Sequence, residues 1–300
     1  MHLSRRALLT ATGATALLGA LPAGATARPG FPRAHPIRRI PLQGAVNVRD
    51  LGGYPTYDGR RVRYGLAYRG DHLARLTDPD LSTLDGLGLR TVVDLRIPLE
   101  VGQDGADRLP AGPVPVPRPV TDNGLFGRLL TAIGSRDPVR QEEMLGGGRA
   151  AAFMREVYRT FVTDPANRAA FAATLRDLAD PRRGPLLLHC TSGKDRTGWT
   201  SWLLLTLLGV PEPLARADYL ASNTFRAAYD ARLREELERA GLMRNPALII
   251  PLQEVREEYL DTALEQLRSS YGSVFRYVSV GLGLDPRELP ALRARLVPAA

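Results

Sequence analysis

The stretch HCTSGKDRTG, at residues 189–198, contains the only cysteine of the 300-residue chain. It also contains the only lysine, since every other residue among the 40 Lys+Arg is arginine. A cysteine thiolate is a strong nucleophile, and lysine and arginine side chains bind anions. The sequence therefore predicts a reactive site in this stretch that acts on an anionic group.

The stretch lies between two apolar segments, GPLLLH and RTGWTSWLLLTLLGV, which indicate a buried strand and a buried helix. A helix N-terminus offers unpaired N–H groups and the positive end of the helix dipole, which stabilise a thiolate at Cys190 and bind phosphate. Arg196 can bind two phosphate oxygens with its planar guanidinium. Gly193 allows a tight turn around the anion, and Thr197 places a hydroxyl near the thiolate. The expected phosphate-binding residues are Thr191, Ser192, Gly193, Lys194, Asp195 and Arg196.

The flanking segments predict an α/β protein that positions this loop. YPTYDGRRVRYGLAYRG, with an Asp58-Gly59 turn, indicates a hairpin, and RTVVDLR indicates a buried strand. Helices are expected at 78–87, with Thr77 or Asp78 as the cap, and at 150–162 and 165–178. From residue 212 onward, segments such as PLARADYLASN and FRAAYDARLREELERAG predict a helical C-terminal part.

The region 102–148 is rich in proline, has weak periodicity and contains three consecutive glycines. Long segments of this kind in a compact domain often cover functional sites. We therefore expect a candidate lid around 120–148, with a helix at 125–133 inside it.

HCTSGKDRTG matches the H-C-x5-R-[ST] signature and resembles the cysteine-dependent protein tyrosine phosphatases. The Lys-Asp pair before the arginine resembles an exported bacterial branch with tyrosine and phosphoinositide phosphatase activity. The resemblance covers most of residues 44–280 and implies a phosphatase-type central, partly parallel sheet flanked by helices, a phosphocysteine intermediate, and no metal or cofactor. Gly70 departs from the serine expected in relatives. Further matching segments are NVRDLGGY at 47–54, YRG at 68–70, VVDLR at 92–96, DYLASN at 218–223 and YGS at 271–273.

Other polar residues have two interpretations each. His189 is expected to pack and tune the thiolate rather than act as a base, because a thiolate needs none. Asn47, Arg49 and Asp50 either contribute to the pocket or stabilise a turn. Asp94 and Arg96 lie at a strand end, where open α/β sheets bind ligands, or they form a structural ion pair. Asp218, Tyr219 and Asn223 are expected to support the site from behind or to pack their helix.

The leaving oxygen of a phosphate ester needs a proton, which the thiolate cannot supply. Asp195 lies within the loop, but Lys194 and Arg196 beside it favour its ionised form. Asp122, ahead of the candidate lid, could approach the leaving oxygen, or could be a turn aspartate before Asn123-Gly124. The sequence narrowly favours Asp122 as the acid, with Asp195 as a loop organiser that could share the task.

The first 27 residues have a basic start, a short apolar run and an A-x-A cleavage site at residues 25–27. Ser4-Arg5-Arg6 resembles a twin-arginine export signal. We therefore expect a cleaved signal peptide at 1–27, a proline-rich linker at 28–36, one phosphatase domain at 37–300, and an exported protein without a stable membrane span. A single cysteine permits no intrachain disulfide.

The formal net charge is +8, or 8 − 2 = +6 after loss of Arg5 and Arg6. This charge suits an anionic partner or simply reflects a solvated arginine-rich surface. No block of like charges points to nucleic acid, and no feature points to a particular oligomeric state.

We therefore expect a phosphomonoesterase, with a phosphotyrosyl protein as substrate. The alternative substrate is a phosphoinositide. A rhodanese-like sulfurtransferase and a non-catalytic phosphate-binding module are weaker alternatives, since the first does not need Arg196 and the second does not need Cys190.

Overall fold

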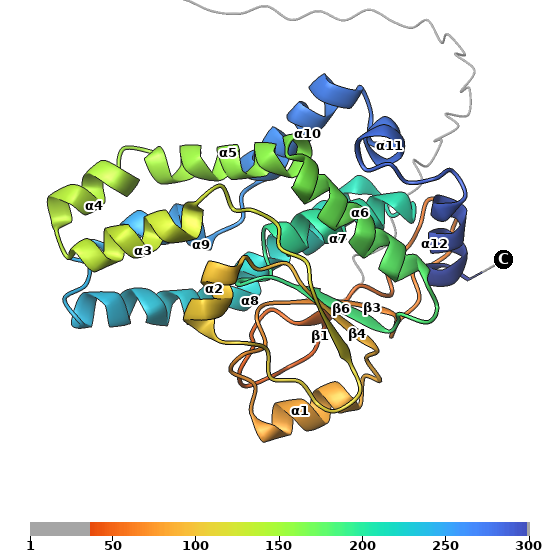
Figure 1. The fold of residues 1–300 in the computed structure, drawn as a ribbon, viewed down its shortest axis with the longest axis horizontal. Helices are drawn as coiled ribbons and strands as arrows, with labels where there is room; N and C mark the ends of the chain where they lie inside the picture. Colours follow the sequence, from red (N-terminus) through yellow and green to blue (C-terminus); the bar gives the residue numbers. More distant parts are fainter. Residues whose placement is uncertain (1–36, 299–300) are drawn as a thin grey trace, which may run out of the picture. The chain divides into compact units, whose positions relative to one another are not determined.

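The structure is a computed structural model that describes residues 37–298, so the predicted signal peptide at 1–27 and linker at 28–36 lie outside the described residues. Its centre is a six-stranded sheet with the order β1-β2-β3-β6-β4-β5 (Figure 1). Strands β3, β6, β4 and β5 are parallel, whereas β1 and β2 are antiparallel. The predicted α/β class with a partly parallel sheet is confirmed. The strands are β1 Arg38–Arg39, β2 Arg49–Asp50, β3 Ala67–Gly70, β4 Thr91–Asp94, β5 Val114–Pro117 and β6 Leu186–His189.

Alternating side chains of the central strands enter two different cores, as the twofold periodicity of a strand requires. Val92 and Leu187 pack with Leu84 of helix α1 (Asp78–Asp85) on one face. Val93 and Leu188 pack on the other face, in the larger core. Helices α5 (Arg149–Thr163), α6 (Pro165–Ala179) and α7 (Arg196–Leu207) contribute to that larger core and cover its face (Figure 1).

Helix α7 holds both tryptophans of the chain. Trp199 and Trp202 are buried, and their rings stack with centroids 5.7 Å apart at 14°. Each fully buried aromatic side chain contributes on the order of 2–3 kcal/mol through apolar burial. This packing anchors α7 and therefore fixes the loop that precedes it.

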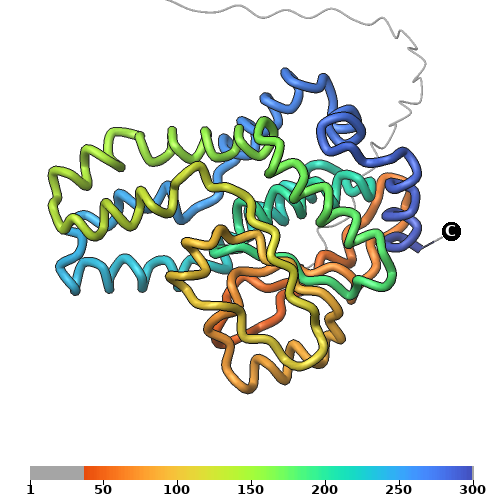
Figure 2. Tube along the Cα trace, viewed as in Figure 1, coloured from red at the N-terminus to blue at the C-terminus, as the bar shows by residue number. Residues whose placement is uncertain are grey.

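Several helices begin where the sequence predicts. Thr77 caps α1 in a reciprocal capping box with Asp80, and α5 and α6 match their predicted segments within one residue at each end. The tube view shows α5 beside α10, and α3 and α4 also contact α5 (Figure 2). The remaining helices are α2 Pro98–Asp104, α3 Leu125–Ser135, α4 Pro138–Leu145, α8 Glu212–Arg239, η1 Pro246–Ile249, α9 Ile250–Gln253, α10 Glu257–Tyr271, α11 Val274–Arg276, η2 Tyr277–Gly281 and α12 Glu288–Leu296.

The C-terminal part differs from the expectation in one respect: the two helices expected from residue 213 onward form one continuous helix, α8. Ser222 and Asn223 lie inside α8 without ending it. Their side chains bond to other elements, Ser222 Oγ to Arg49 and Asn223 to the backbone of Val255. A polar side chain with a distant partner does not compete for its own helix backbone. Within residues 37–298, no helix is long and apolar enough to cross a bilayer.

Candidate active site

The loop between β6 and α7 forms a cradle whose carbonyl groups are held from outside. Asn47 Nδ2 donates to the carbonyl oxygens of Ser192 and Gly193 at 3.0 and 3.1 Å, and Arg69 Nη2 donates to that of Gly193 at 2.7 Å. Arg226 Nη1 reaches the Ser192 carbonyl at 3.4 Å. Within the described chain, the backbone N–H groups of residues 191–195 donate to no other group. They remain available for an anion at the start of α7.

Gly193 is required by the close approach of this cradle to the end of β3. Its φ is +65°, and a Cβ atom there would lie 2.3 Å from the Gly70 carbonyl oxygen and 2.5 Å from the Asp71 nitrogen. Only glycine fits both the left-handed backbone and this contact. Gly70, the position that departs from the expected serine, therefore contacts the loop through its backbone.

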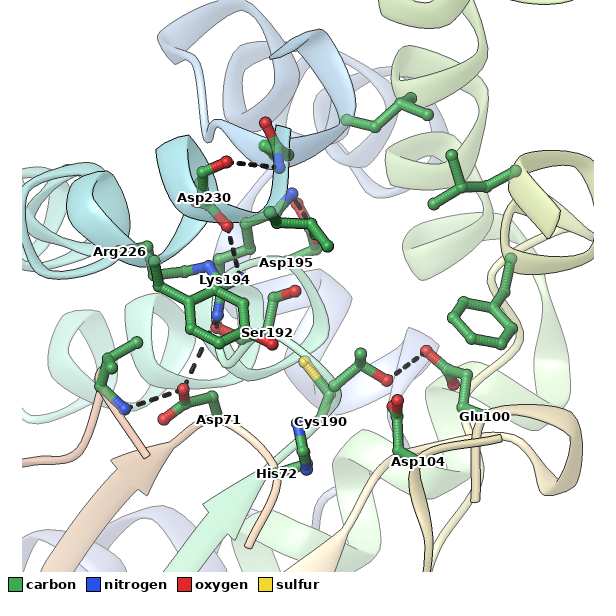
Figure 3. Close-up of a pocket in the computed structure, with 18 of the residues that line it drawn as sticks. Asp71, His72, Glu100, Asp104, Cys190, Ser192, Lys194, Asp195, Arg226 and Asp230 are labelled. Carbon is green, nitrogen blue, oxygen red and sulfur yellow. Dashed lines mark hydrogen bonds and ion pairs between the residues drawn. The ribbon is translucent and has the colours of Figure 1, made fainter. Parts of the chain in front are cut away.

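Cys190 is 1% exposed and follows β6 directly. It lines a pocket of about 730 Å³ together with Thr191, Ser192, Lys194, Asp195 and Arg196 (Figure 3). Thr197 is fully buried, and its hydroxyl has no hydrogen-bond partner among the described residues. The structure thus brings the predicted nucleophile and five of the six predicted phosphate-binding residues to one cavity, whereas Gly193 lies against the end of β3.

Arg196 is held along one edge of its guanidinium by Glu100, the third residue of α2. Nη1 donates to Glu100 Oε2 at 2.6 Å and Nη2 pairs with Oε1. Glu100 also accepts bonds from Thr191 Oγ1 at 2.6 Å and from the Ile97 backbone at 2.8 Å. Burial works to raise the pKa of Glu100, but the charge and bonds of Arg196, together with the bonds from Thr191 and Ile97, lower it overall. The Nε edge of Arg196 contacts no acceptor in the described residues, so it can bind phosphate.

Lys194 is 2% exposed and does not project freely into the pocket. Its Nζ donates to both carboxyl oxygens of Asp195, at 3.0 and 2.8 Å, and to the Glu254 carbonyl at 3.3 Å. Asp195 Oδ1 also accepts a bond from the Tyr158 hydroxyl at 2.9 Å. The ammonium therefore orders Asp195 at the pocket, where Figure 3 shows the two side chains together.

Asp122 is 4% exposed and lines the same pocket. Both of its carboxyl oxygens are used by the backbone at the start of α3: Oδ1 accepts from Gly124 at 3.0 Å and Oδ2 from Phe126 at 2.7 Å. These bonds match the interpretation of Asp122 as a turn aspartate. Its charge also acts on Arg196: burial lowers the pKa of Arg196, but Glu100, Cys190 and Asp122 together raise it.

A buried network joins the N-terminal segment to α8 behind the cradle. Arg49 Nε donates to Asp218 Oδ1 at 2.8 Å, and Arg69 Nη1 donates to Asp218 Oδ2 at 2.6 Å. Arg49 Nη1 also fixes Asn47 through its Oδ1 at 2.6 Å. Burial would raise the pKa of Asp218, but the two arginines lower it to about 2. Asn47 therefore supports the loop directly, and Arg49 supports it through Asn47.

Asp50 does not reach the loop. Its carboxyl oxygens accept bonds from the backbone of Gly52 and Gly65, each at 2.8 Å. Burial is the main reason that its pKa is raised. Of the two interpretations for this residue, the contacts match the turn-stabilising one.

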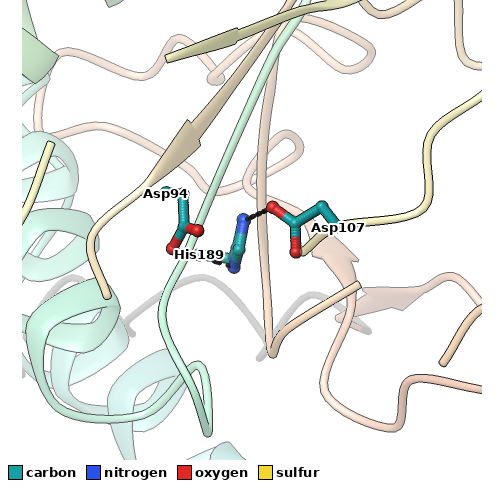
Figure 4. A group of neighbouring side chains, drawn as sticks. All are labelled: Asp94, Asp107 and His189. Atoms are coloured by element: carbon teal, nitrogen blue, oxygen red, sulfur yellow. Dashed lines mark hydrogen bonds and ion pairs between the residues drawn. The ribbon is translucent and has the colours of Figure 1, made fainter. Parts of the chain in front are cut away.

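His189 is fully buried at the end of β6 and clusters with two half-buried aspartates, Asp94 and Asp107 (Figure 4). Its Nε2 contacts Asp107 Oδ2 at 2.8 Å, while its Nδ1 is 3.9 Å from Asp94 Oδ1. Burial lowers the pKa of His189, but the bond and charge of Asp107, together with the charge of Asp94, make the net shift upward. The three side chains could approach a metal ion. Arg96, however, bridges both carboxylates at 2.8 and 2.9 Å, so a cation is already in place and the pattern fits a structural ion pair.

The far half of the pocket is apolar. One wall is α3, and the opposite wall is formed by α8, η1 and α9. This half adjoins the loop, so a phosphate held by Arg196 can carry an apolar group. Its apolar lining residues are Leu125, Phe126, Leu129, Leu130, Ile133, Val157, Phe161, Leu233, Leu237, Ile249 and Leu252.

Comparison with known proteins gives the family. The family model described as "Tyrosine phosphatase family" matches residues 40–298. The chain belongs to the tyrosine phosphatase family. This phosphatase is therefore a phosphoric monoester hydrolase, as the loop predicts, and the sulfurtransferase and binding-module alternatives gain no support from the comparisons.

Curated relatives of this tyrosine phosphatase have related names. A putative tyrosine-protein phosphatase of Cupriavidus necator is 36% identical over 81% of this chain and 84% of its own length. The triple specificity protein phosphatase PtpB of Mycobacterium tuberculosis is 31% identical over 81% of this chain and 92% of its own. A tyrosine-protein phosphatase of Nostoc commune is 26% identical over 75% of this chain and 71% of its own.

Sequence reasoning missed several residues that organise the phosphatase loop. Glu100 binds Arg196 from 96 positions away, and the only local signal was an acid three residues after Ile97 at a helix start. Arg69 was inside the YRG segment without a role assigned to it. Tyr158 gave no signal beyond an aromatic position on an amphipathic helix.

Proposed function

We propose that this phosphatase acts through Cys190 as nucleophile and a phosphocysteine intermediate. One observation carries the proposal: Cys190, the free N–H groups of residues 191–195 and the open edge of Arg196 meet at one pocket. The thiolate attacks phosphorus, the S–P bond forms and the ester P–O bond breaks. Water then attacks phosphorus and the S–P bond breaks. Inorganic phosphate is released and the thiolate is regenerated.

Arg196 and the loop amides stabilise the charge on the transferring phosphoryl group. Oriented donors in a water-excluded site stabilise developing charge most strongly when they need no rearrangement. Asn47 and Arg69 supply this order by holding the loop carbonyls outward. Glu100 supplies it for Arg196 by fixing the opposite edge of the guanidinium.

Asp195 is the general acid that the contacts favour. Both oxygens of Asp122 cap the start of α3, so a movement toward the substrate would break two backbone bonds. Among the described residues, the Asp195 carboxylate is bonded only by the side chains of Lys194 and Tyr158, which can rearrange without disturbing a helix. In the first step Asp195 gives its proton to the leaving oxygen, and in the second its carboxylate takes one from water.

The nucleophile is tested with Cys190→Ser. We expect turnover of p-nitrophenyl phosphate to fall by at least about 10³-fold, because a serine hydroxyl stays protonated where a thiol ionises. Thermal unfolding and phosphate binding should remain close to wild type. Turnover near the wild-type rate would overturn the mechanism.

The acid is tested with Asp195→Asn and Asp122→Asn on two substrates. Loss of the acid should slow phenyl phosphate, which has a poor leaving group, about 10²-fold, and should flatten the basic limb of the pH profile. It should affect p-nitrophenyl phosphate much less. If Asp122→Asn shows this pattern and Asp195→Asn does not, Asp122 has the role.

We propose phosphotyrosyl protein as the substrate class, and α3–α4 as a lid over the bound side chain. The apolar wall of α3 adjoins the loop and would contact the tyrosyl ring. The same wall can accept the apolar part of a phosphoinositide, and the relative PtpB is named for triple specificity. Rates on phosphotyrosyl peptides and on a phosphoinositide panel, measured side by side, decide between them.

We further propose that the phosphatase is exported by the twin-arginine route. The Lys194-Asp195 pair, which resembles the exported branch of the family, agrees with this proposal. The support is the basic start, apolar run and A-x-A site of residues 1–27. Mass spectrometry of the exported protein should find Arg28 at the N-terminus. An intact residue 1 on the exported protein would contradict cleavage.

A further inference from the structure

A chain of buried hydroxyl groups runs from Asp195 into the core. The Tyr158 hydroxyl on α5 lies 2.9 Å from Asp195 Oδ1 and 2.8 Å from the Tyr219 hydroxyl on α8. The Tyr219 hydroxyl in turn lies 3.3 Å from the Arg256 carbonyl oxygen. Both tyrosines are 0% exposed. The three contacts therefore form one series from the pocket to the start of α10.

The number of protons in this series depends on Asp195. Each tyrosine hydroxyl can donate one bond and accept others. When Asp195 is ionised, Tyr219 donates to Tyr158 and Tyr158 to the carboxylate. The Arg256 carbonyl then keeps its backbone donors, the N–H groups of Tyr259 at 3.1 Å and Leu260 at 3.5 Å, but loses the tyrosine hydroxyl. When Asp195 is protonated, it can donate to Tyr158, Tyr158 to Tyr219, and Tyr219 to Arg256. The second arrangement fills all three contacts.

The tyrosines themselves do not ionise in the range where a carboxyl group titrates. Burial, followed by the charge of Asp195, raises the pKa of Tyr158 well above its ordinary value of 10. Burial and the same charge raise the pKa of Tyr219 well above 10. Their hydroxyl hydrogens can therefore rotate between the two arrangements while the proton count of each tyrosine stays fixed.

We propose that Tyr158 and Tyr219 are positioning residues for Asp195, and that their hydroxyl chain reverses direction each time Asp195 gains or loses its catalytic proton. The inference rests on the proposed role of Asp195 as the acid. In the first step the carboxyl proton moves to the leaving oxygen, and both hydroxyls turn toward the carboxylate. In the second, a proton from the attacking water returns to the carboxylate and both hydroxyls turn back.

Other charged or titratable groups around the chain are few in the described structure. The Lys194 ammonium contacts both oxygens of Asp195. Tyr259 of α10 packs on Tyr158 at 5.8 Å, but its hydroxyl donates to the Pro251 carbonyl at 3.0 Å. The positive charge of Arg69, in β3, acts to lower the pKa of Tyr219. All three groups stay in place in the variants below, except where Tyr259 is itself the control.

The test is the pH dependence of kcat on phenyl phosphate for Tyr158→Phe and Tyr219→Phe. Tyr158→Phe removes the donor to the carboxylate, so the basic limb should move to higher pH. Tyr219→Phe removes the acceptor that the protonated arrangement needs, so the limb should move to lower pH. Each displacement should be about half a unit to one unit, the size of one net hydrogen bond. The matched control, Tyr259→Phe, should leave the limb in place.

Displacements in the same direction, or none, would overturn the reversing chain. Asp195→Asn separates this failure from failure of the acid assignment: if it keeps the wild-type limb and leaving-group dependence, the acid assignment itself is wrong. If it removes the limb while the two tyrosine variants keep it, only the present inference is wrong.

A measurement on the wild-type protein does not depend on how the variants fold. With ¹³C-labelled arginine carbonyls, the Arg256 signal should shift as Asp195 is protonated, because that carbonyl, which already accepts from the Tyr259 backbone, gains the Tyr219 hydroxyl as a further donor only then. The shift should be missing in Asp195→Asn. A pH-independent Arg256 signal in the wild type would also overturn the proposal.

Discussion

The two edges of the Arg196 guanidinium have different roles: one binds Glu100 and the other can bind phosphate. One edge is bound to Glu100, and the Nε edge is open toward the pocket. A planar fork can bind two carboxylate oxygens and two phosphate oxygens at once, whereas an ammonium has one centre of charge. The position therefore needs arginine and not only a positive charge.

We expect Arg196→Lys to lower kcat/KM on p-nitrophenyl phosphate by about 10²–10³-fold, in the range for loss of an oriented donor in the transition state. A lysine that stays on Glu100 cannot also reach the phosphate. Arg118→Lys is the matched control, because Arg118 pairs with Asp177 outside the pocket. Activity of Arg196→Lys above about one tenth of wild type would show that the loop amides alone bind the phosphoryl group.

At the residue scale, the sequence predicts the reactive loop but not the partners of its side chains. Cys190 and Arg196 have a fixed spacing along the chain, which a motif can reveal. Glu100 and Tyr158 meet the loop only after the sheet and α5 have packed. The sequence also places the Lys194 ammonium at phosphate, whereas Asp195 and Glu254 hold it in the structure. Local spacing carries no information about such distant pairings.

At the element scale, the cradle depends on how closely it approaches β3. We expect Gly193→Ala to abolish activity and to destabilise the fold by about 2–4 kcal/mol, since a Cβ would meet the Gly70 carbonyl at 2.3 Å and strain a left-handed backbone. Gly59→Ala is the control. It has a similar φ of +79° with nothing within 4 Å, so it should cost only about 1–2 kcal/mol and keep full activity.

Activity and urea unfolding of both variants check this prediction. If Gly193→Ala and Gly59→Ala lose the same stability and both stay active, the contact between the cradle and β3 is not needed.

Elements with strong local signals match their predictions, while those decided by distant contacts do not. Thr77 and its capping box define α1 locally. In β5, Pro115 and Pro117 made the segment look irregular, yet an edge strand tolerates proline because one side of it has no partner strand. In α8, Ser222 and Asn223 lie inside the helix, and their side chains bond to other elements.

At the scale of the whole molecule, Asp218 joins the sheet to α8. Its pKa is about 2 in the fold against an ordinary value of 3.8, so its stabilising effect is complete above about pH 4 and is lost as the pH falls toward 2. We expect Asp218→Asn to lower the free energy of unfolding by about 3–5 kcal/mol at pH 7, because Arg49 and Arg69 lose their buried partner.

Urea unfolding of wild type and Asp218→Asn at several pH values checks this prediction. The difference between the two proteins should shrink between about pH 4 and pH 2. A difference that stays constant over that range would show that the Asp218 charge contributes nothing and that the loss arises from packing. Asp261→Asn, at a half-exposed ion pair, is the matched control and should cost about 1 kcal/mol or less.

The alternation of apolar strands and helices predicts the fold class. The two-residue strands β1 and β2 could not be predicted from the sequence. Strands of that length have no periodicity of their own. Their positions depend on the pairing of β2 with β3 and on side chains such as Arg49 that bond across the molecule.

The stacked tryptophans of α7 give this protein an intrinsic fluorescence signal that comes from one helix. Trp199 and Trp202 are the only indole fluorophores in the chain, and both belong to the helix that begins at Arg196. All tryptophan emission therefore originates within the first two turns of that helix, in an apolar environment that shifts it to shorter wavelength. Unlabelled protein should report any loosening of the phosphate cradle directly, without a signal from the rest of the molecule.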